Sequence, residues 1–143
     1  MTDFLEAAKV LGVERREGRI SSALQYLALL NRGLPVTSLE RISNAIAPTD
    51  VHFKYRIVSK ATLARLRSKR KLNSNQSVLI SRLAGIWARA LQVWKSAGSA
   101  RDFLCRPHPL LEGKLPIDLV LENEIGARLV EDILGRLEHG SAV

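Results

Sequence analysis

Apolar residues recur every three or four positions along most of this chain, which is the spacing that places them on one face of an α-helix. The longest such stretch runs from Asn75 to Ala97, and Asn73 or Ser74 can cap its start. Its apolar stripe consists of Leu79, Leu83, Ile86, Trp87, Ala90, Leu91 and Trp94. We expect this helix to form the spine of the core, to end at Gly98-Ser99, and to be followed by one more helical turn at Ala100–Leu104.

A first short helix is expected at the N-terminus. Asp3 can cap a helix over Asp3–Leu11, because Glu6 follows three residues later, and Gly12 can end it. The next residues, Val13–Arg19, are charged and have no apolar period, so they predict a linker.

Two further helices are expected before Asp50. The earlier one starts after Ser21 or Ser22, ends before Gly33, and has the apolar stripe Leu24, Leu27 and Leu30. The later one starts at the capping-box pattern Thr37-x-x-Glu40 and ends before Pro48. Its apolar stripe is Leu39, Ile42 and Ile46.

The segment from Asp50 to Lys71 predicts two short helices. Asp50 can cap a weakly apolar one over Val51–Ile57, and Ser59 can cap the other over Ala61–Arg70. Leu63 and Leu66 are the only large apolar residues of the second helix, and most of its remaining surface is cationic.

The C-terminal part begins with a loop rich in proline and glycine over Arg106–Pro116. Pro116 is placed to open a short helix at Ile117–Leu121, and Asn123 to cap a last helix that Gly140 closes. The predicted buried face of that last helix is Ile125, Leu129, Val130, Ile133, Leu134 and Leu137. No segment alternates as a strand would and no repeat is visible, so we expect an all-α fold.

Charge divides the chain into three blocks. Val51 to Arg101 contains twelve Lys or Arg and no Asp or Glu, whereas Met1–Asp50 holds six of each sign. The last block, Asp102–Val143, holds four basic and eight acidic residues. The net charge of +8 therefore belongs to the central block, which indicates a polyanion partner there and a different partner for the acidic end.

Length and composition fit one domain, or two small helical parts that share a core. The chain has 143 residues, of which 46% are hydrophobic, and no apolar run is long enough to span a membrane. The N-terminal residues lack the pattern of a signal peptide. The single cysteine, Cys105, cannot form an internal disulfide, which favours a reducing, cytoplasmic location.

The polar residues do not predict an enzyme. His52, His108 and His139 lie in separate contexts without metal-ligand spacing, so no metal site is expected. Cys105-x-x-His108 offers a nucleophile and a base but no third group to orient them. No glycine cluster follows a strand, so no phosphate-binding loop and no cofactor are expected.

The basic segment fits a helix-turn-helix, in which the second helix enters the major groove of DNA. Its first turn, with Ser59, Lys60 and Thr62, is where base contacts would come from. Arg65 and Arg67 can reach bases or phosphates, and Lys69, Arg70 and Lys71 suit phosphates. The alternative interpretation is a solvated basic helix whose charges complement the helix dipole.

The stretch from Arg106 to Gly140 resembles the C-terminal toxin-binding domain of the Xre/MbcA/ParS family of antitoxins. The matching residues are Pro109, Leu111, Gly113, Pro116, Asp118, Leu119, Gly126, Val130, Leu134, Arg136 and Gly140. Upstream, the family's helix-turn-helix and the long helix after it match at Ser59 to Leu63, Arg65, Leu72, Ser77 and Arg82 to Ala84. The resemblance covers roughly Ser22 to Gly140. Ala61 departs from the family, which often has arginine there, and this affects the expected operator sequence.

The resemblance implies a type II antitoxin that covers the NAD site of a RES-domain toxin and represses its own operon. It also implies a homodimer whose recognition helices lie one DNA turn apart. The expected parts are a variable segment at residues 1–20, a DNA-binding domain at 21–95 and a toxin-binding domain at 96–143. The expected toxin contacts are Arg106, His108, Leu111, Lys114, Asp118, Glu122, Arg136, His139, Gly140 and Val143.

Two other interpretations stay open. One is a free-standing helix-turn-helix regulator whose C-terminal domain senses a ligand or partner. The other is a nucleic-acid-binding protein without sequence preference and without a protein partner.

Overall fold

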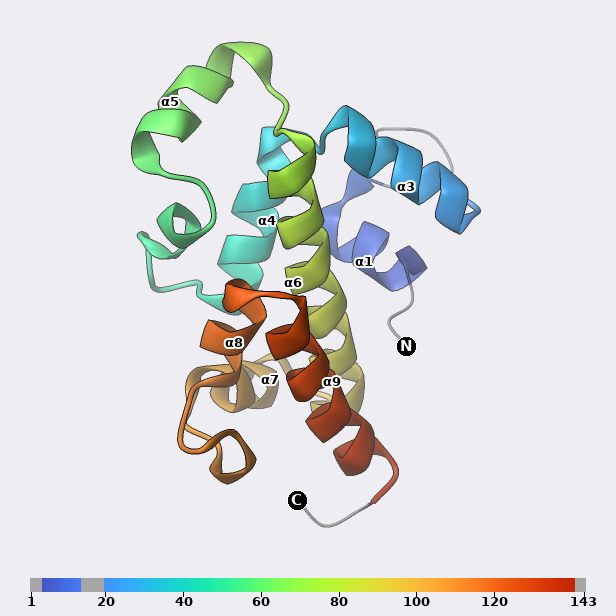
Figure 1. Cartoon of the computed structure of the whole chain (residues 1–143), viewed down its shortest axis with the longest axis vertical. Helices are drawn as coiled ribbons and strands as arrows, with labels where there is room; N and C mark the ends of the chain where they lie inside the picture. Colours follow the sequence, from blue (N-terminus) through green and yellow to red (C-terminus); the bar gives the residue numbers. More distant parts are fainter. Residues whose placement is uncertain (1–3, 14–19, 141–143) are drawn as a thin grey trace.

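A single long helix, α6 (Ser74–Trp94), runs through the middle of the fold, and the other helices are arranged around it (Figure 1). The computed structural model describes residues 4–13 and 20–140, and all regular elements in these ranges are helical. They are α1 (Phe4–Leu11), α3 (Ala23–Arg32), α4 (Val36–Ile46), the 3-10 helix η1 (Phe53–Arg56), α5 (Lys60–Lys69), α6, α7 (Ala97–Cys105), the 3-10 helix η2 (Pro109–Leu111), α8 (Pro116–Glu122) and α9 (Glu124–Glu138). The all-α prediction is confirmed. In the described ranges, no helix is long and apolar enough to cross a membrane.

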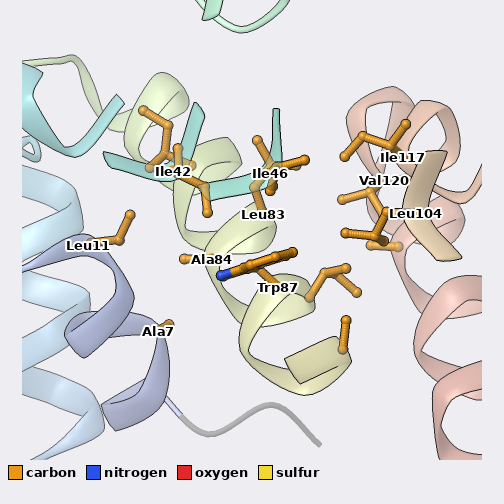
Figure 2. Close-up of a cluster of buried hydrophobic side chains, with 14 of the residues drawn as sticks. Ala7, Leu11, Ile42, Ile46, Leu83, Ala84, Trp87, Leu104, Ile117 and Val120 are labelled. Carbon is orange, nitrogen blue, oxygen red and sulfur yellow. The ribbon is translucent and has the colours of Figure 1, made fainter. Parts of the chain in front are cut away.

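Helix α6 is the spine because it is buried on several sides. It packs against α1, α3, α4, α7, α8 and α9. Figure 2 shows side chains from α1, α4, α7 and α8 meeting in one cluster around Leu83, Ala84 and Trp87 of α6. Leu83 is fully buried, and burying one leucine contributes about 2 kcal/mol to stability.

The turn between α3 and α4 is fastened to the segment that leads into α6. The backbone N–H of Leu72 donates to the carbonyl oxygen of Leu34 at 2.9 Å. The buried Ser77 hydroxyl accepts from the N–H of Leu34 at 2.8 Å and donates to the carbonyl of Asn73 at 2.7 Å. Gly33 is required at this point, because its φ is +105° and a Cβ would overlap the carbonyl oxygen of Leu72.

Several predicted helix starts are confirmed. The side chains of Ser22, Ser59, Asn73 and Asn123 each accept a backbone N–H in the first turn of α3, α5, α6 and α9. Pro116 opens α8 as expected. The predicted cap at Asp3 lies outside the described residues.

Two predictions in the N-terminal half are wrong. Helix α4 begins at Val36 after Pro35, with no side-chain cap hydrogen bond, so Thr37-x-x-Glu40 is not its capping box. The segment after Asp50 forms only a short 3-10 helix; Asp50 accepts the N–H of His52 at 3.0 Å. The linker predicted over Val13–Arg19 begins with a residue that is 1% exposed, and residues 14–19 lie outside the described ranges.

The predicted end of the long helix is also wrong. Helix α6 stops at Trp94 because Lys95 adopts the left-handed conformation, with φ of 64°. Ser96 then caps α7, its hydroxyl accepting the N–H of Ser99 at 3.1 Å. Gly98 therefore lies inside α7, with open space around it, instead of ending a helix.

Three predicted apolar stripes differ in part from the faces that are buried. In α3 the buried residues are Tyr26, Leu29 and Leu30, while Leu24 and Leu27 are exposed. A spacing of three falls short of a full helical turn, so a stripe of that kind drifts around the helix, and the neighbouring helices decide which face is covered.

The same correction applies to α9 and α6. Ile125 and Leu129 of α9 are exposed, and Gly126 and Ala127 are buried in their place because α9 packs closely on α8. In α6 the buried face includes Ser77, Ile80 and Ala88, whereas Leu79 and Leu91 are half-buried and Trp94 is exposed.

Candidate nucleic-acid and partner-binding surfaces

Helix α5 stands out from the bundle, at the upper left of Figure 1. Ser59 caps it, accepting the N–H of Thr62 at 3.2 Å. Leu63 is its one buried residue, and Leu66 is half-buried against the core. The rest of the helix surface is open to a ligand.

We call the central block, Val51 to Arg101, the acid-free block because it contains no Asp or Glu. Its basic residues have different roles. Five of the twelve hold the fold together through contacts with carboxylates or carbonyl oxygens. These contacts are Lys54 with Glu40 at 2.9 Å, Arg56 with Asp118 at 2.8 Å, Arg89 with Glu138 at 3.4 Å, Arg82 with the Val120 carbonyl at 3.3 Å, and Arg101 with the Ala45 carbonyl at 2.8 Å. The hydrogen bond from Lys54 to Glu40 raises the pKa of the lysine.

Six of the seven basic residues left in this block gather on one element, and the seventh, Lys95, follows the end of α6. Six exposed cations lie on α5 and just after it, and none of them forms an ion pair with a described carboxylate. They are Lys60, Arg65, Arg67, Lys69, Arg70 and Lys71. Together with Ser59 and Thr62, these are the eight residues predicted to contact DNA, and the structure places all eight on or beside this one helix.

The first turns of α5 form a small polar network. The Ser59 hydroxyl donates to the Thr62 hydroxyl at 2.8 Å, and the Arg65 guanidinium donates to the same Thr62 oxygen at 3.2 Å. This network orients Arg65 along the helix.

The end of α5 and the start of α4 enclose a basic cavity. It has a volume of about 520 Å³ and is lined by Pro35, Val36, Thr37, Arg67, Lys69, Arg70 and Lys71. The N–H of Val36 donates to the carbonyl of Arg70 at 3.1 Å, which fixes the two walls to each other. With four cations and no carboxylate in its lining, the cavity suits a phosphate.

The element before α5 is shorter than the predicted helix-turn-helix requires. It is the 3-10 helix η1, whose Phe53 is buried, and Val58 is buried in the connection to α5. The Lys54–Glu40 ion pair ties η1 to α4. The α-helix that precedes α5 in the chain is therefore α4, with η1 in the turn between them.

The residues predicted to contact the toxin lie in the C-terminal part, but not all are available. Those exposed are Arg106, Lys114, Asp118, Glu122, Arg136, His139 and Gly140. Leu111 is 6% exposed and belongs to the hydrophobic core, so its side chain is not available on the surface of the free chain. His108 is half-buried, and Val143 lies outside the described residues.

The loop that carries His108 is closed by its own hydrogen bonds. Nδ1 of His108 accepts the N–H of Leu110 at 3.1 Å, and its backbone N–H donates to the carbonyl of Lys114 at 3.1 Å. The N–H of Gly113 donates to the His108 carbonyl at 3.0 Å. The loop is therefore a fixed surface on which a partner can dock.

An aromatic cavity lies beside this loop, and the sequence did not indicate it. The Phe103 ring lies 5.9 Å from the Trp94 ring and 5.9 Å edge-on from the His108 ring. The cavity has a volume of about 440 Å³ and is lined by Trp94, Ser99, Asp102, Phe103, Arg106, Pro107, His108 and Leu137. Trp94 was predicted to be buried on α6, so its place on a surface was missed.

The Cys105–His108 pair is not arranged for nucleophilic catalysis. Burial raises the pKa of the Cys105 thiol, so at neutral pH it stays protonated and weakly nucleophilic. His108 uses Nδ1 to cap η2. In the described part of the chain, no three His, Cys, Asp or Glu side chains are grouped so as to hold a metal ion.

Comparisons with known proteins match both halves of the chain. Residues 25–85 match the family model described as the antitoxin Xre-like helix-turn-helix domain. Residues 89–140 match the model described as the antitoxin Xre/MbcA/ParS C-terminal toxin-binding domain. The chain is also similar to a protein named Antitoxin Xre from Photorhabdus laumondii subsp. laumondii, with 29% identity over 123 residues, which cover 84% of this chain and 82% of the relative.

Proposed function

We propose a binding partner for each domain of this chain, which belongs to the Xre/MbcA/ParS family of type II antitoxins and has their helix-turn-helix and toxin-binding domains. The toxin is a RES-domain protein that consumes NAD or transfers ADP-ribose, and the antitoxin neutralises it by covering its NAD site. The antitoxin also represses its own operon as a homodimer. Members of this family are regulators, and the chain is not an enzyme.

The observation that supports the DNA-binding half most strongly is the set of six cations on and beside α5 without carboxylate partners among the described residues. In the proposed complex α5 lies in the major groove, with Ser59, Lys60 and Thr62 nearest the bases. Arg65 and Arg67 reach bases or the backbone. Lys69, Arg70 and Lys71 hold phosphates, with Arg67 sharing the basic cavity with them.

Charge supports the toxin-binding half. The block from Asp102 to Val143 carries eight acidic and four basic residues, so it complements the basic cleft that an NAD-binding toxin needs for the dinucleotide phosphates. The contacts we propose are the loop from Arg106 to Lys114, without Leu111, and the end of α9 with its tail. Asp118 and Glu122 of α8 extend the surface.

We assign residues 21–95 to DNA binding and 96–143 to toxin binding, in the bacterial cytoplasm. Helix α6 crosses from one matched region into the other, so it joins the two functions mechanically. Arg101 of α7 supports this connection, because its Nε donates to the carbonyl of Ala45 in α4 at 2.8 Å.

Co-expression with the neighbouring gene tests the proposal. A tagged antitoxin should retain the toxin at fixed stoichiometry, and the released toxin should hydrolyse NAD until antitoxin is added back. The variant Arg67→Ala with Lys71→Ala should lose DNA binding and still neutralise the toxin. Retention of no protein, or of one without activity on NAD, would contradict the proposed partner.

The free-standing regulator gives a different result in the same experiment. It would bind its promoter without a protein partner, and its gene would not be accompanied by a toxin gene. The match to a toxin-binding domain favours the antitoxin.

A further inference from the structure

Helix α3 carries apolar side chains on two opposite faces. Its inner face buries Tyr26, Leu29 and Leu30. Its outer face exposes Leu24 by 76% and Leu27 by 51%. A helix that is apolar on both faces is normally covered on both, and the outer face of α3 is left open in one copy of the described chain.

The same helix is free of charge over most of its length. No Asp, Glu, Lys or Arg occurs from Ile20 to Asn31, and Ala28 adds a small exposed residue beside the two leucines. Two copies of a chain with a net charge of +8 repel each other, and they can approach most easily where neither presents a charge.

Symmetry favours a second copy over an unlike partner. Across a two-fold axis each residue faces itself or its near neighbours, so a charged face would place like charges together. Leu24, Leu27 and Ala28 are compatible with themselves in such a contact. An acidic or basic partner would gain nothing from this neutral face, whereas it would gain from the charged surfaces elsewhere on the chain.

We propose that the outer face of α3 is the homodimer surface, packed against α3 of a second copy through Leu24, Leu27 and Ala28. This inference rests on the proposed DNA-binding function for its purpose, because a single short α5 reads only one half-site and a two-fold partner supplies the second.

The size of this surface sets the strength of the dimer. A helix of ten residues is about 15 Å long at the helical rise per residue, so the contact falls well below the roughly 800 Å² per partner of a stable interface. The free protein is therefore a reversible mixture of monomer and dimer. Operator DNA shifts it to the dimer, because two linked half-sites hold both copies at high effective concentration.

The arrangement also sets the placement of the half-sites. Helices α3 and α5 lie on opposite sides of α6 in Figure 1, so pairing through α3 places the two α5 helices at the outer ends of the dimer. The operator half-sites then face the two ends of the dimer, with α6 and α3 of each copy between them.

Sedimentation equilibrium over a range of concentrations tests the surface. The wild-type chain should associate reversibly, and Leu24→Glu with Leu27→Glu should stay monomeric at every concentration. Ile125→Glu is the matched control, because Ile125 of α9 is 71% exposed but lies on another helix. Its association should equal that of the wild type, and circular dichroism should show all three proteins equally helical.

Two results of the sedimentation experiment would overturn the proposal: a wild-type chain that is monomeric throughout, or a double variant that associates like the wild type. Titration of the promoter fragment upstream of the chain's own gene separates this proposal from the proposed function. If the double variant binds this fragment as a dimer with the affinity of the wild type, the proposed dimer surface is wrong and the proposed DNA-binding function stands. If dimerisation depends on Leu24 and Leu27 but the dimer does not bind this fragment, the dimer surface is confirmed and the proposed operator binding is wrong. Loss of toxin capture with an intact dimer would show that α3 belongs to the toxin interface.

Discussion

Arg101 and Arg67 belong to the same acid-free block but have opposite environments. Nε of Arg101 donates to the Ala45 carbonyl at 2.8 Å, and its guanidinium lies 5.6 Å from the centre of the Trp87 ring. Arg67 is exposed in the wall of the basic cavity. Charge alone therefore does not tell a structural arginine from one that is free to bind a ligand, and the neighbours of each residue decide.

Replacing each arginine by alanine should separate these roles. Arg101→Ala should lower the free energy of unfolding by about 1–3 kcal/mol, because it leaves a carbonyl unpaired and removes the contact with Trp87. Arg67→Ala should change it by less than about 0.5 kcal/mol. Urea denaturation measures both, and the order should reverse in a DNA-binding assay. Equal losses of stability would contradict this division.

Gly126 is the residue on which the close packing of α8 and α9 depends. A Cβ there would overlap the carbonyl oxygen of Leu119, which is backbone and cannot move without shifting α8. Gly126→Ala should therefore destabilise the fold by about 1–3 kcal/mol or more.

The control for this change is Gly98→Ala, at a helical glycine with open space around it. That substitution should stabilise by about 0.5–1 kcal/mol, because alanine loses less conformational freedom in a helix. Thermal melting should move the two variants in opposite directions. A shared direction would show that the space around Gly126 does not limit the packing.

At the scale of elements, starts of helices were easier to predict than faces or ends. Ser59, Asn73 and Asn123 were predicted as caps because their side chains act within one turn, which a local sequence contains. The faces of α3 and α9 depend on helices far away in sequence. The end of α6 depends on Lys95 entering a conformation that glycine favours, so Gly98 was the stronger local signal.

Prediction of the candidate surfaces from the sequence was limited in the same way. The eight residues predicted for DNA came from a local charge pattern, and the structure gathers them at α5, although their role there stays a prediction. The aromatic cavity joins Trp94 of α6 to Phe103 of α7 and His108 of the next loop. A period within one helix cannot show that these rings meet across the break at Ser96.

The Ser59 cap should control how well α5 forms. Ser59→Ala removes the hydrogen bond to the N–H of Thr62 and should cost about 1 kcal/mol of helix stability. Because Leu63 is the one buried side chain of α5, the loss should appear as faster amide exchange in α5 alone.

Ser59→Asp is the companion variant. Aspartate caps a helix as well as serine does, so amide exchange in α5 should stay slow. Its negative charge at the proposed DNA surface should still weaken DNA binding. Unchanged affinity for DNA would place Ser59 outside that surface.

Across the whole molecule, charge of opposite sign is concentrated at opposite ends of one rigid helix. The exposed Arg56–Asp118 ion pair at 2.8 Å is one direct link between them, and an exposed pair of this kind contributes at most about 1 kcal/mol. The two ends are therefore joined mainly by α6 and the core around it.

This separation predicts a steep dependence of DNA binding on salt. If about four cations per subunit contact phosphates, a dimer should show a slope near −7 in a plot of log affinity against log salt concentration. Titrations of the promoter fragment from low to physiological salt would measure it. A slope shallower than about −3 would contradict an operator-bound dimer with this interface.

The weak attachment of α5 has a consequence for the lifetime of the proposed repression. With only Leu63 buried and Leu66 half-buried to hold it, α5 can open without unfolding the bundle, and its Lys and Arg residues then become substrates for a trypsin-like protease. Bound DNA would protect the helix by holding it closed. A single cut there would end DNA binding and leave the distant C-terminal surface standing, so a nicked chain would still restrain its toxin while its promoter is released.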